Sequence, residues 1–195
     1  MTRRFLLSVL AVLVLAACSP EKPTFNGIDI TGADYAKGIN LTDHNGQARS
    51  LSDFKGKVVV VFFGYTQCPD VCPTTMTELV EVKRLLGANG DKLQGVFVTV
   101  DPVRDTPELL KAYMTNFDPT FVAFIPTADQ LAVVAKDFKI YYKKQDGKTP
   151  TSYTMDHSAG SYVFDTQGNV RLYSRYGSGA QVLAQDIQTL LKTTP

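Results

Sequence analysis

The chain has 195 residues, of which 44% are hydrophobic, so it is long enough and apolar enough for one packed domain with short appendages. Its 20 lysine and arginine residues balance 19 aspartate and glutamate residues, and the net charge is +1. This balance is not typical of a nucleic-acid-binding protein, and the composition is not that of a globally disordered chain.

The first segment, residues 1–17, has the features of a secretory signal peptide. Arg3 and Arg4 precede a short apolar run without charge, and two alanines come directly before Cys18. The stretch LAAC is similar to a bacterial lipobox, in which the cysteine is lipidated and becomes the N-terminus. We therefore expect a lipid on Cys18 to attach the protein to a membrane. The alternative is an ordinary signal peptide that leaves Cys18 without a role.

Removal of the signal peptide would leave 18 basic and 19 acidic residues, a net charge of −1. Residues 18–26 are short, polar and contain proline, which predicts a tether between the lipidated cysteine and a domain over 27–195. We expect this domain to lie in the bacterial cell envelope, in the periplasm or outside the cytoplasmic membrane.

Strand and helix signals alternate along the domain. Hydrophobic patterns, turn residues and helix caps predict strands at 39–43, 57–64, 93–101 and 121–126, helices at 73–86, 106–116, 127–138 and 182–192, and a hairpin within 161–177. This order predicts an α/β sandwich in which helices flank a mixed central sheet. It is the order of the thioredoxin fold with an added N-terminal β-hairpin and an inserted strand–helix unit.

Two cysteines remain in the domain, Cys68 and Cys72, between the buried strand and the helix that follows it. If the first helical turn includes both, their sulfurs share one face, and the helix N-terminus favours thiolates. The spacing suits a bound metal or a disulfide in an oxidising compartment. A purely structural disulfide is less favoured because it would close a very short loop, and zinc is less favoured because only two thiols exist.

His157 precedes the predicted strand that begins near residue 161. In thioredoxin-like proteins this position faces the active-site cysteines. Two thiolates and one imidazole make a three-coordinate site that suits copper. Asp156 is expected to orient the imidazole or to occupy an outer position. The alternative is a hydrogen-bonded histidine without a ligand role, and His44, in a polar turn, is expected to be solvated.

Two further acidic residues follow the second buried strand. Asp101 lies at the carboxyl edge of the predicted sheet, where sites on open α/β sheets form, and we expect it to help shape the metal pocket. Asp105 is expected to cap the next helix together with Thr106.

Three segments, FFGYTQCPDVCPTTM at 62–76, FVTVDPVRDTPELLKAYM at 97–114 and YTMDHSAGSYVFDTQGNVRLYSRYG at 153–177, resemble the Sco/SenC family of copper-binding cytochrome oxidase assembly proteins. The resemblance extends over roughly residues 39–192. It implies one Cu(I) or Cu(II) ion held by Cys68, Cys72 and His157. It further implies that a copper donor protein supplies the ion and that the dinuclear copper centre of cytochrome c oxidase subunit II receives it.

The resemblance also leaves room for a second function, in which the cysteine pair reduces the cysteines of that subunit. The leading hypothesis is a metallochaperone, which is a binding protein and not an enzyme. The second is a thiol–disulfide oxidoreductase with Cys68 and Cys72 as its redox pair. A peroxidase of the peroxiredoxin kind is disfavoured, because its Thr-x-x-Cys motif is absent: Thr66 lies two residues before Cys68. Gln67 stands where many family members carry another residue, and no ligand role is expected for it.

Overall fold

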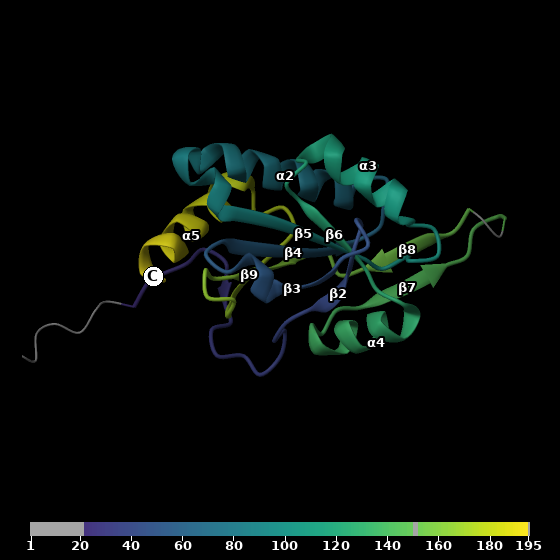
Figure 1. Ribbon diagram of the computed structural model, residues 1–195, viewed down its shortest axis with the longest axis horizontal. Helices are drawn as coiled ribbons and strands as arrows, with labels where there is room; N and C mark the ends of the chain where they lie inside the picture. The colour runs from purple at the N-terminus through teal and green to yellow at the C-terminus, as the bar shows by residue number, and fades with distance from the viewer. Residues whose placement is uncertain (1–21, 150–151, 195) are drawn as a thin grey trace, which may run out of the picture.

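The computed structural model describes residues 22–149 and 152–194, so the predicted signal peptide and Cys18 lie outside the described residues. Helices cover both faces of a central sheet (Figure 1). In this view α2 (Val71–Leu85) and α3 (Pro107–Phe117) lie above the sheet and α4 (Ala128–Asp137) lies below it. The α/β prediction is confirmed.

The central sheet has eight strands in the order β1-β10-β9-β4-β5-β6-β2-β3. They are β1 (Ile28–Asp29), β2 (Asn40–Asp43), β3 (Ala48–Ser50), β4 (Val58–Gly64), β5 (Leu93–Thr99), β6 (Val122–Ile125), β9 (Ser161–Phe164) and β10 (Val170–Ser174). Strands β4, β5 and β6 are parallel, whereas β9 runs antiparallel to β4 and β2 runs antiparallel to β6. The sheet is therefore mixed, as predicted.

The core is centred on β4 and β5, in which every residue is buried. Continuous β-branched and aromatic runs are typical of strands that helices cover on both faces. The helix α2 turns Met76, Leu79 and Val82 into this core, and α5 (Ala180–Thr193) packs against α2. Two short 3-10 helices, η1 (Leu51–Phe54) and η2 (Gly87–Lys92), each lead into a central strand. This rigid centre fixes the carboxyl end of β4, where the first predicted cysteine follows.

The predicted N-terminal hairpin is formed by β2 and β3 at one edge of the sheet. The buried carboxylate of Asp43 accepts hydrogen bonds from the backbone nitrogens of Asn45 and Gln47, and from Nε of Arg49 at 2.7 Å. Gly46 takes the positive φ of 76° that the turn requires. One buried acid therefore organises the hairpin.

The prediction that His44 is solvated is wrong. Its side chain is half-buried, and its Nδ1 accepts a hydrogen bond of 2.9 Å from the backbone nitrogen of Ala123. The His44 backbone nitrogen donates in turn to the Ala123 oxygen, which extends the pairing of β2 with β6. Loss of solvent lowers the pKa of this histidine. The polar turn sequence gave no sign that the turn lies against a neighbouring strand.

A second, two-stranded sheet was not predicted. Strands β7 (Tyr142–Gln145) and β8 (Thr154–His157) form an antiparallel hairpin, and His157 pairs with Tyr142. Figure 1 shows this hairpin at the opposite end of the molecule from α5. Its polar, lysine-containing strands lack a strong hydrophobic alternation, so His157 was expected in a loop and instead ends a strand.

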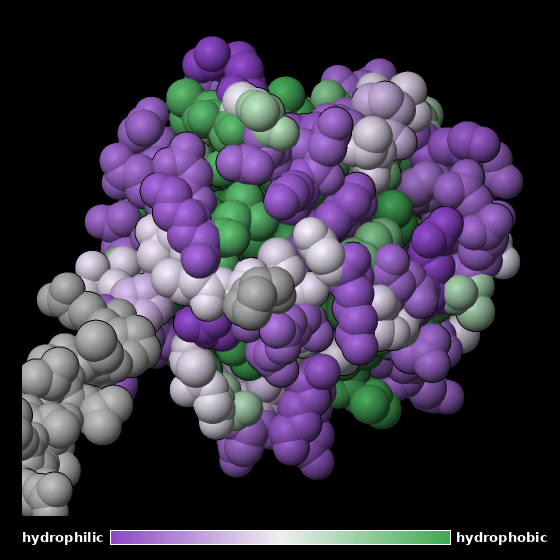
Figure 2. All heavy atoms as spheres, turned by 60° about the vertical axis from the view of Figure 1, so that its left-hand side comes forward, coloured by the Kyte–Doolittle hydropathy of each residue, from purple (hydrophilic) through white to green (hydrophobic). Residues whose placement is uncertain are grey.

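The beginning of the described chain is bound to the domain. The buried carboxylate of Asp186 in α5 accepts hydrogen bonds from the backbone nitrogens of Asn26 and Gly27, each at 2.8 Å. On the face drawn in Figure 2, hydrophilic residues cover most of the surface and hydrophobic residues are visible in the gaps between them. No helix among the described residues combines the length and the apolar character needed to cross a membrane.

Candidate metal centre

The two cysteines occupy different positions relative to α2. Cys68 precedes the helix, which begins at Val71, and Cys72 is its second residue. The condition that the first helical turn includes both cysteines is therefore not met by Cys68. The backbone nitrogen of Cys72 donates to the Cys68 sulfur at 3.4 Å, so the free amide of the first turn brings the sulfurs together. Both cysteines are free, Cys72 is buried and Cys68 is half-buried.

Gly64, the last residue of β4, allows the Cys72 sulfur to lie directly against the sheet. A Cβ at this position would lie 2.8 Å from Cys72 Sγ, 2.8 Å from a Phe62 ring carbon and 3.0 Å from a Phe97 ring carbon. These separations are far below ordinary van der Waals contact. The absence of a side chain at residue 64 thus creates the seat of the second sulfur, and the sequence analysis did not identify this role.

The imidazole of His157 reaches the same place from the other side. Its Nε2 lies 3.4 Å from the Cys72 sulfur, and its Nδ1 lies 3.0 Å from the backbone oxygen of Ser158. Because a carbonyl oxygen only accepts, Nδ1 carries the proton and Nε2 of the neutral ring keeps its lone pair. The rings of Phe62 and Tyr65 meet the imidazole edge-on, each with centroids 5.9 Å away. The ring is thus oriented with a free nitrogen toward the sulfurs.

One donor atom from each of Cys68, Cys72 and His157 lies within 4.8 Å of the other two. A cleft of about 480 Å³ opens beside them and is lined by Tyr65, Cys68, His157 and the neighbouring residues of both segments. Two soft sulfur donors and one imidazole nitrogen are suited to copper, and the set is too small and too sulfur-rich for a hard cation such as magnesium. The three residues that the sequence analysis singled out are therefore brought together.

The two thiols differ strongly in acidity. A hydrogen bond from the Cys72 thiol is the largest influence on Cys68, and it lowers the pKa of this thiol to about 3 against the opposing effect of desolvation. The same hydrogen bond, together with burial, raises the pKa of Cys72. At neutral pH the metal-free site therefore holds one thiolate and one thiol, and a soft cation would displace the proton of Cys72 when it binds.

Asp156 does not orient the imidazole, because the Ser158 carbonyl occupies the hydrogen bond to Nδ1. The side chain of Asp156 is on the solvent side of β8, where it accepts a hydrogen bond of 2.5 Å from Gln145 Nε2. Successive residues of a strand point to opposite faces, so a residue next to His157 cannot share its direction. An outer role at the metal centre remains a prediction for Asp156.

Asp101 and Asp105 are both buried, and both bind groups beside the cysteines, not the cysteines themselves. Asp101 accepts hydrogen bonds from Arg104 Nε and from the Tyr153 hydroxyl. Asp105 accepts from the hydroxyls of Thr66 and Thr99, each at 2.6 Å. Desolvation raises the pKa of Asp105.

The cap of α3 is Thr106 alone, whose hydroxyl oxygen accepts from the backbone nitrogen of Leu109. The expectation that Asp105 shares this cap is therefore wrong. Asp105 instead fastens the turn before Cys68 to the end of β5, through Thr66 and Thr99.

Two further residues at the site were missed. Met155 lines the same cleft and shares a face of β8 with His157, because the two are separated by two positions. Its thioether is a soft group of the kind that copper accepts. Arg104 links the cysteine turn to the hairpin through hydrogen bonds to Gln67 and Tyr153. The i, i+2 spacing could have revealed Met155 had the strand been predicted. Arg104 has a local contact with Asp101 three positions earlier, but this contact gives no indication of the link to the hairpin.

The fold and the donor set together define a thioredoxin-like protein with a soft-metal centre between the turn after β4 and the end of β8. More particularly, the chain belongs to the SCO1/SenC family, whose model matches residues 29–192.

Individual relatives agree with this assignment. A SCO2-like protein of Rickettsia felis is 33% identical over 159 residues, which are 80% of this chain and 78% of that protein. The structure of Bradyrhizobium japonicum ScoI with copper bound is 38% identical, has a TM-score of 0.71, and is matched over 78% of this chain and 97% of that one. Yeast Sco1 with copper bound is 26% identical with a TM-score of 0.73, over 89% of this chain and 91% of the other.

Proposed function

We propose that this protein is a copper metallochaperone, which binds one Cu(I) or Cu(II) ion through Cys68, Cys72 and His157 and supports assembly of the dinuclear copper site of cytochrome c oxidase. The observation that carries the proposal is the convergence of three soft donors within 4.8 Å of one another. Relatives of known structure, B. japonicum ScoI and yeast Sco1, are described with copper bound, which supports the same metal here.

The arrangement of the donors suits temporary binding. Three protein ligands leave a coordination position open, and the adjoining cleft gives a partner side chain access to it. Cys68 is the more exposed sulfur, whereas Cys72 is fully buried against Gly64. A thiolate of the receiving protein would enter at the open position and replace the ligands one at a time, so copper passes between proteins without being released to solvent.

In this proposal the receiving protein is cytochrome c oxidase subunit II, and a separate copper donor protein loads the site. A lipid on Cys18 would tether the domain to a membrane of the bacterial envelope. Delivery to an oxidase requires that the domain face the outer side of the cytoplasmic membrane. The predicted secretory signal and lipobox over residues 1–18 support export of the domain across the cytoplasmic membrane and its attachment to a membrane by a lipid.

Copper titration of the reduced domain tests the binding function. A soluble protein beginning at residue 22 should bind one copper per chain and develop a sulfur-to-copper charge-transfer band with Cu(II). Cys68→Ala, Cys72→Ala and His157→Ala should each abolish the band or shift it strongly. Binding that survives all three substitutions would contradict the proposed site.

A thiol–disulfide oxidoreductase is the second candidate. The observation that favours it is the pair of free, unequally exposed thiols, in which the accessible Cys68 receives a hydrogen bond from the Cys72 amide. Cys68 would attack a client disulfide, and Cys72 would then resolve the mixed disulfide. His157→Ala separates the functions, because it should impair copper binding and leave dithiol exchange intact. Full oxidase assembly with His157→Ala would favour the second candidate.

A further inference from the structure

Arg104 joins the three segments that surround the metal centre, and we propose that it is a positioning residue, which holds the hairpin with His157 against the turn with Cys68. The proposal rests on the function proposed above, since it concerns the copper affinity of that site. Arg104 does not belong to the donor set, and its effect on copper would be exerted through His157.

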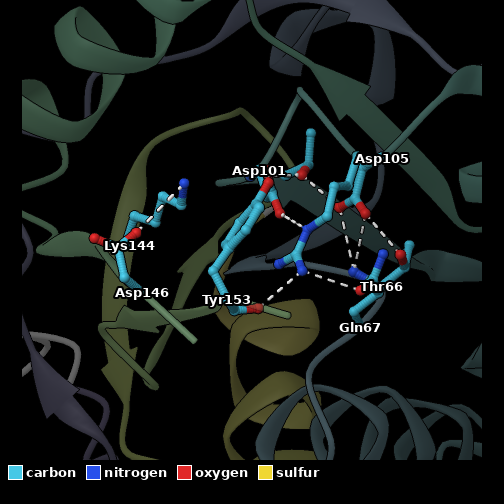
Figure 3. Close-up of polar contacts among 9 residues, drawn as sticks. Thr66, Gln67, Asp101, Asp105, Lys144, Asp146 and Tyr153 are labelled. Carbon is cyan, nitrogen blue, oxygen red and sulfur yellow. Dashed lines mark hydrogen bonds and ion pairs between the residues drawn. The ribbon is translucent and has the colours of Figure 1, made fainter. Parts of the chain in front are cut away.

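The guanidinium of Arg104 binds each segment through a separate contact. Its Nε donates to Asp101 after β5 at 2.5 Å. Its Nη1 donates to the side-chain oxygen of Gln67 at 3.0 Å and to the backbone oxygen of Tyr153 at 2.8 Å. Figure 3 shows Gln67, Asp101 and Tyr153 grouped around these contacts. Gln67 is the residue directly before Cys68, and Tyr153 directly precedes β8.

The ring of Tyr153 strengthens the connection. Arg104 Cζ lies 3.5 Å from the centroid of this ring and Lys144 Nζ lies 4.3 Å from it, while the Tyr153 hydroxyl donates to Asp101 at 2.9 Å. Stacking of a guanidinium on an aromatic face is attractive and depends on its planar shape. The hairpin is thus attached beside its connecting loop, where β8 begins, by a hydrogen bond to its backbone and by a stacked ring.

The hairpin depends on such attachments. Strands β7 and β8 pair only with each other among the described residues and form no backbone ladder with the central sheet. An isolated two-stranded hairpin is marginally stable in water. His157 lies at the end of β8, four residues after Tyr153. A shift at the start of β8 would therefore be passed along the strand to the imidazole at its other end, whereas the Cys72 sulfur is held in α2 against Gly64 of β4.

The burial of Arg104 is not explained by stability alone. Its side chain is only 12% exposed, and its Nη2 is buried with no hydrogen-bond partner among the described residues. A buried donor without a partner costs stability, so the burial of this group needs a compensating role. A planar group that spans three segments supplies one, because lysine could not make the same forked contacts.

A double-mutant cycle tests whether Arg104 acts through His157. The affinity of the reduced domain for Cu(I) is measured by competition with a chromophoric chelator. Arg104→Ala should weaken binding about 10- to 100-fold, the usual effect of removing a group that orients a ligand. In the His157→Ala background the same change should alter the affinity by less than about twofold, because the group it positions is gone. Arg104→Lys should resemble Arg104→Ala.

Two further variants serve as controls for the Arg104 measurements. Arg49→Ala also removes an arginine from a buried aspartate, Asp43, but at the β2–β3 hairpin, and it should leave the copper affinity unchanged. Gln67→Ala removes only the exposed hydrogen-bond partner of Arg104, so this variant should fold even if Arg104→Ala does not. Its loss of copper affinity should be smaller than that of Arg104→Ala, and it should disappear in the His157→Ala background.

The possible results separate the two proposals. If the wild type binds copper and the Arg104 and Gln67 variants bind it with the same affinity, the positioning role is overturned. It is also overturned if Arg104→Ala lowers the copper affinity equally in the presence and in the absence of the His157 side chain. Failure of the wild-type protein to bind copper would instead overturn the proposed function.

Discussion

Gly64 lies so close to the Cys72 sulfur that adding a single methyl group at this position should disturb both the fold and the metal centre. Gly64→Ala places a Cβ 2.8 Å from the Cys72 sulfur, 2.8 Å from the Phe62 ring and 3.0 Å from the Phe97 ring. The backbone cannot yield easily, because β4 is central and Gly64 is paired with Thr99 in the parallel ladder. All three contacts must therefore be relieved by movement of side chains.

Forcing an extra methyl group into a filled core costs about 1–3 kcal/mol of the free energy of unfolding. For a domain of this size each kcal/mol lowers the melting temperature by about 2–4 °C, so we expect Gly64→Ala to melt roughly 2–12 °C below the wild type. All three neighbours are fully buried, so the added methyl group must press on both rings and also on the Cys72 sulfur. Displacement of this sulfur should also weaken copper binding.

Calorimetry of the metal-free domain and copper competition of the same sample measure the two effects. Gly38→Ala is a matched control, because a Cβ at Gly38 meets no atom within 4 Å. The control should leave the free energy of unfolding unchanged or raise it by about 0.4–1 kcal/mol, because alanine reduces the conformational entropy of the unfolded chain. A Gly64→Ala protein that melts with the wild type and binds copper equally well would refute the conclusion that this glycine seats the sulfur.

Two further predictions concern the cysteines and the helix that follows them. Because the pKa of Cys68 lies far below its usual range, its thiolate fraction should stay constant between about pH 5 and pH 8, and its alkylation by iodoacetamide should stay nearly constant with it. An alkylation rate that falls about tenfold for each unit by which the pH is lowered, as for an ordinary thiol, would contradict the low pKa of Cys68. Thr106→Ala removes the cap of α3 and should lower the free energy of unfolding in urea by about 1 kcal/mol without changing copper affinity. A changed affinity would mean that the cap also supports the metal centre.

The sequence predicted the elements whose signals are local. The continuous apolar run of β4 and the β-branched and aromatic residues of β5 predict buried strands, and Thr106 followed by Pro107 predicts the start of a helix. The hairpin of β7 and β8 has no such signal, because its polar strands are held by contacts with distant segments. His44 was misjudged for the same reason: its backbone and ring bind Ala123, 79 positions later.

The metal centre was predictable in part. Two cysteines spaced by four at a strand–helix junction suggest a reactive pair, and His157 was found 85 positions later from its place before β9. The contacts of Arg104 with Gln67 and Tyr153 span 37 and 49 positions and follow no spacing rule. Side-chain contacts between loops depend on how the whole chain folds, so a list of local patterns does not contain them.

X-ray absorption at the copper edge tests the central claim most directly, because it reports the atoms bound to the ion. For the reduced domain loaded with one equivalent of Cu(I), we predict two sulfur ligands and one imidazole nitrogen in the wild type, with the nitrogen signal lost in His157→Ala. A wild-type spectrum with sulfur ligands alone, or one that His157→Ala leaves unchanged, would contradict a centre built from Cys68, Cys72 and His157.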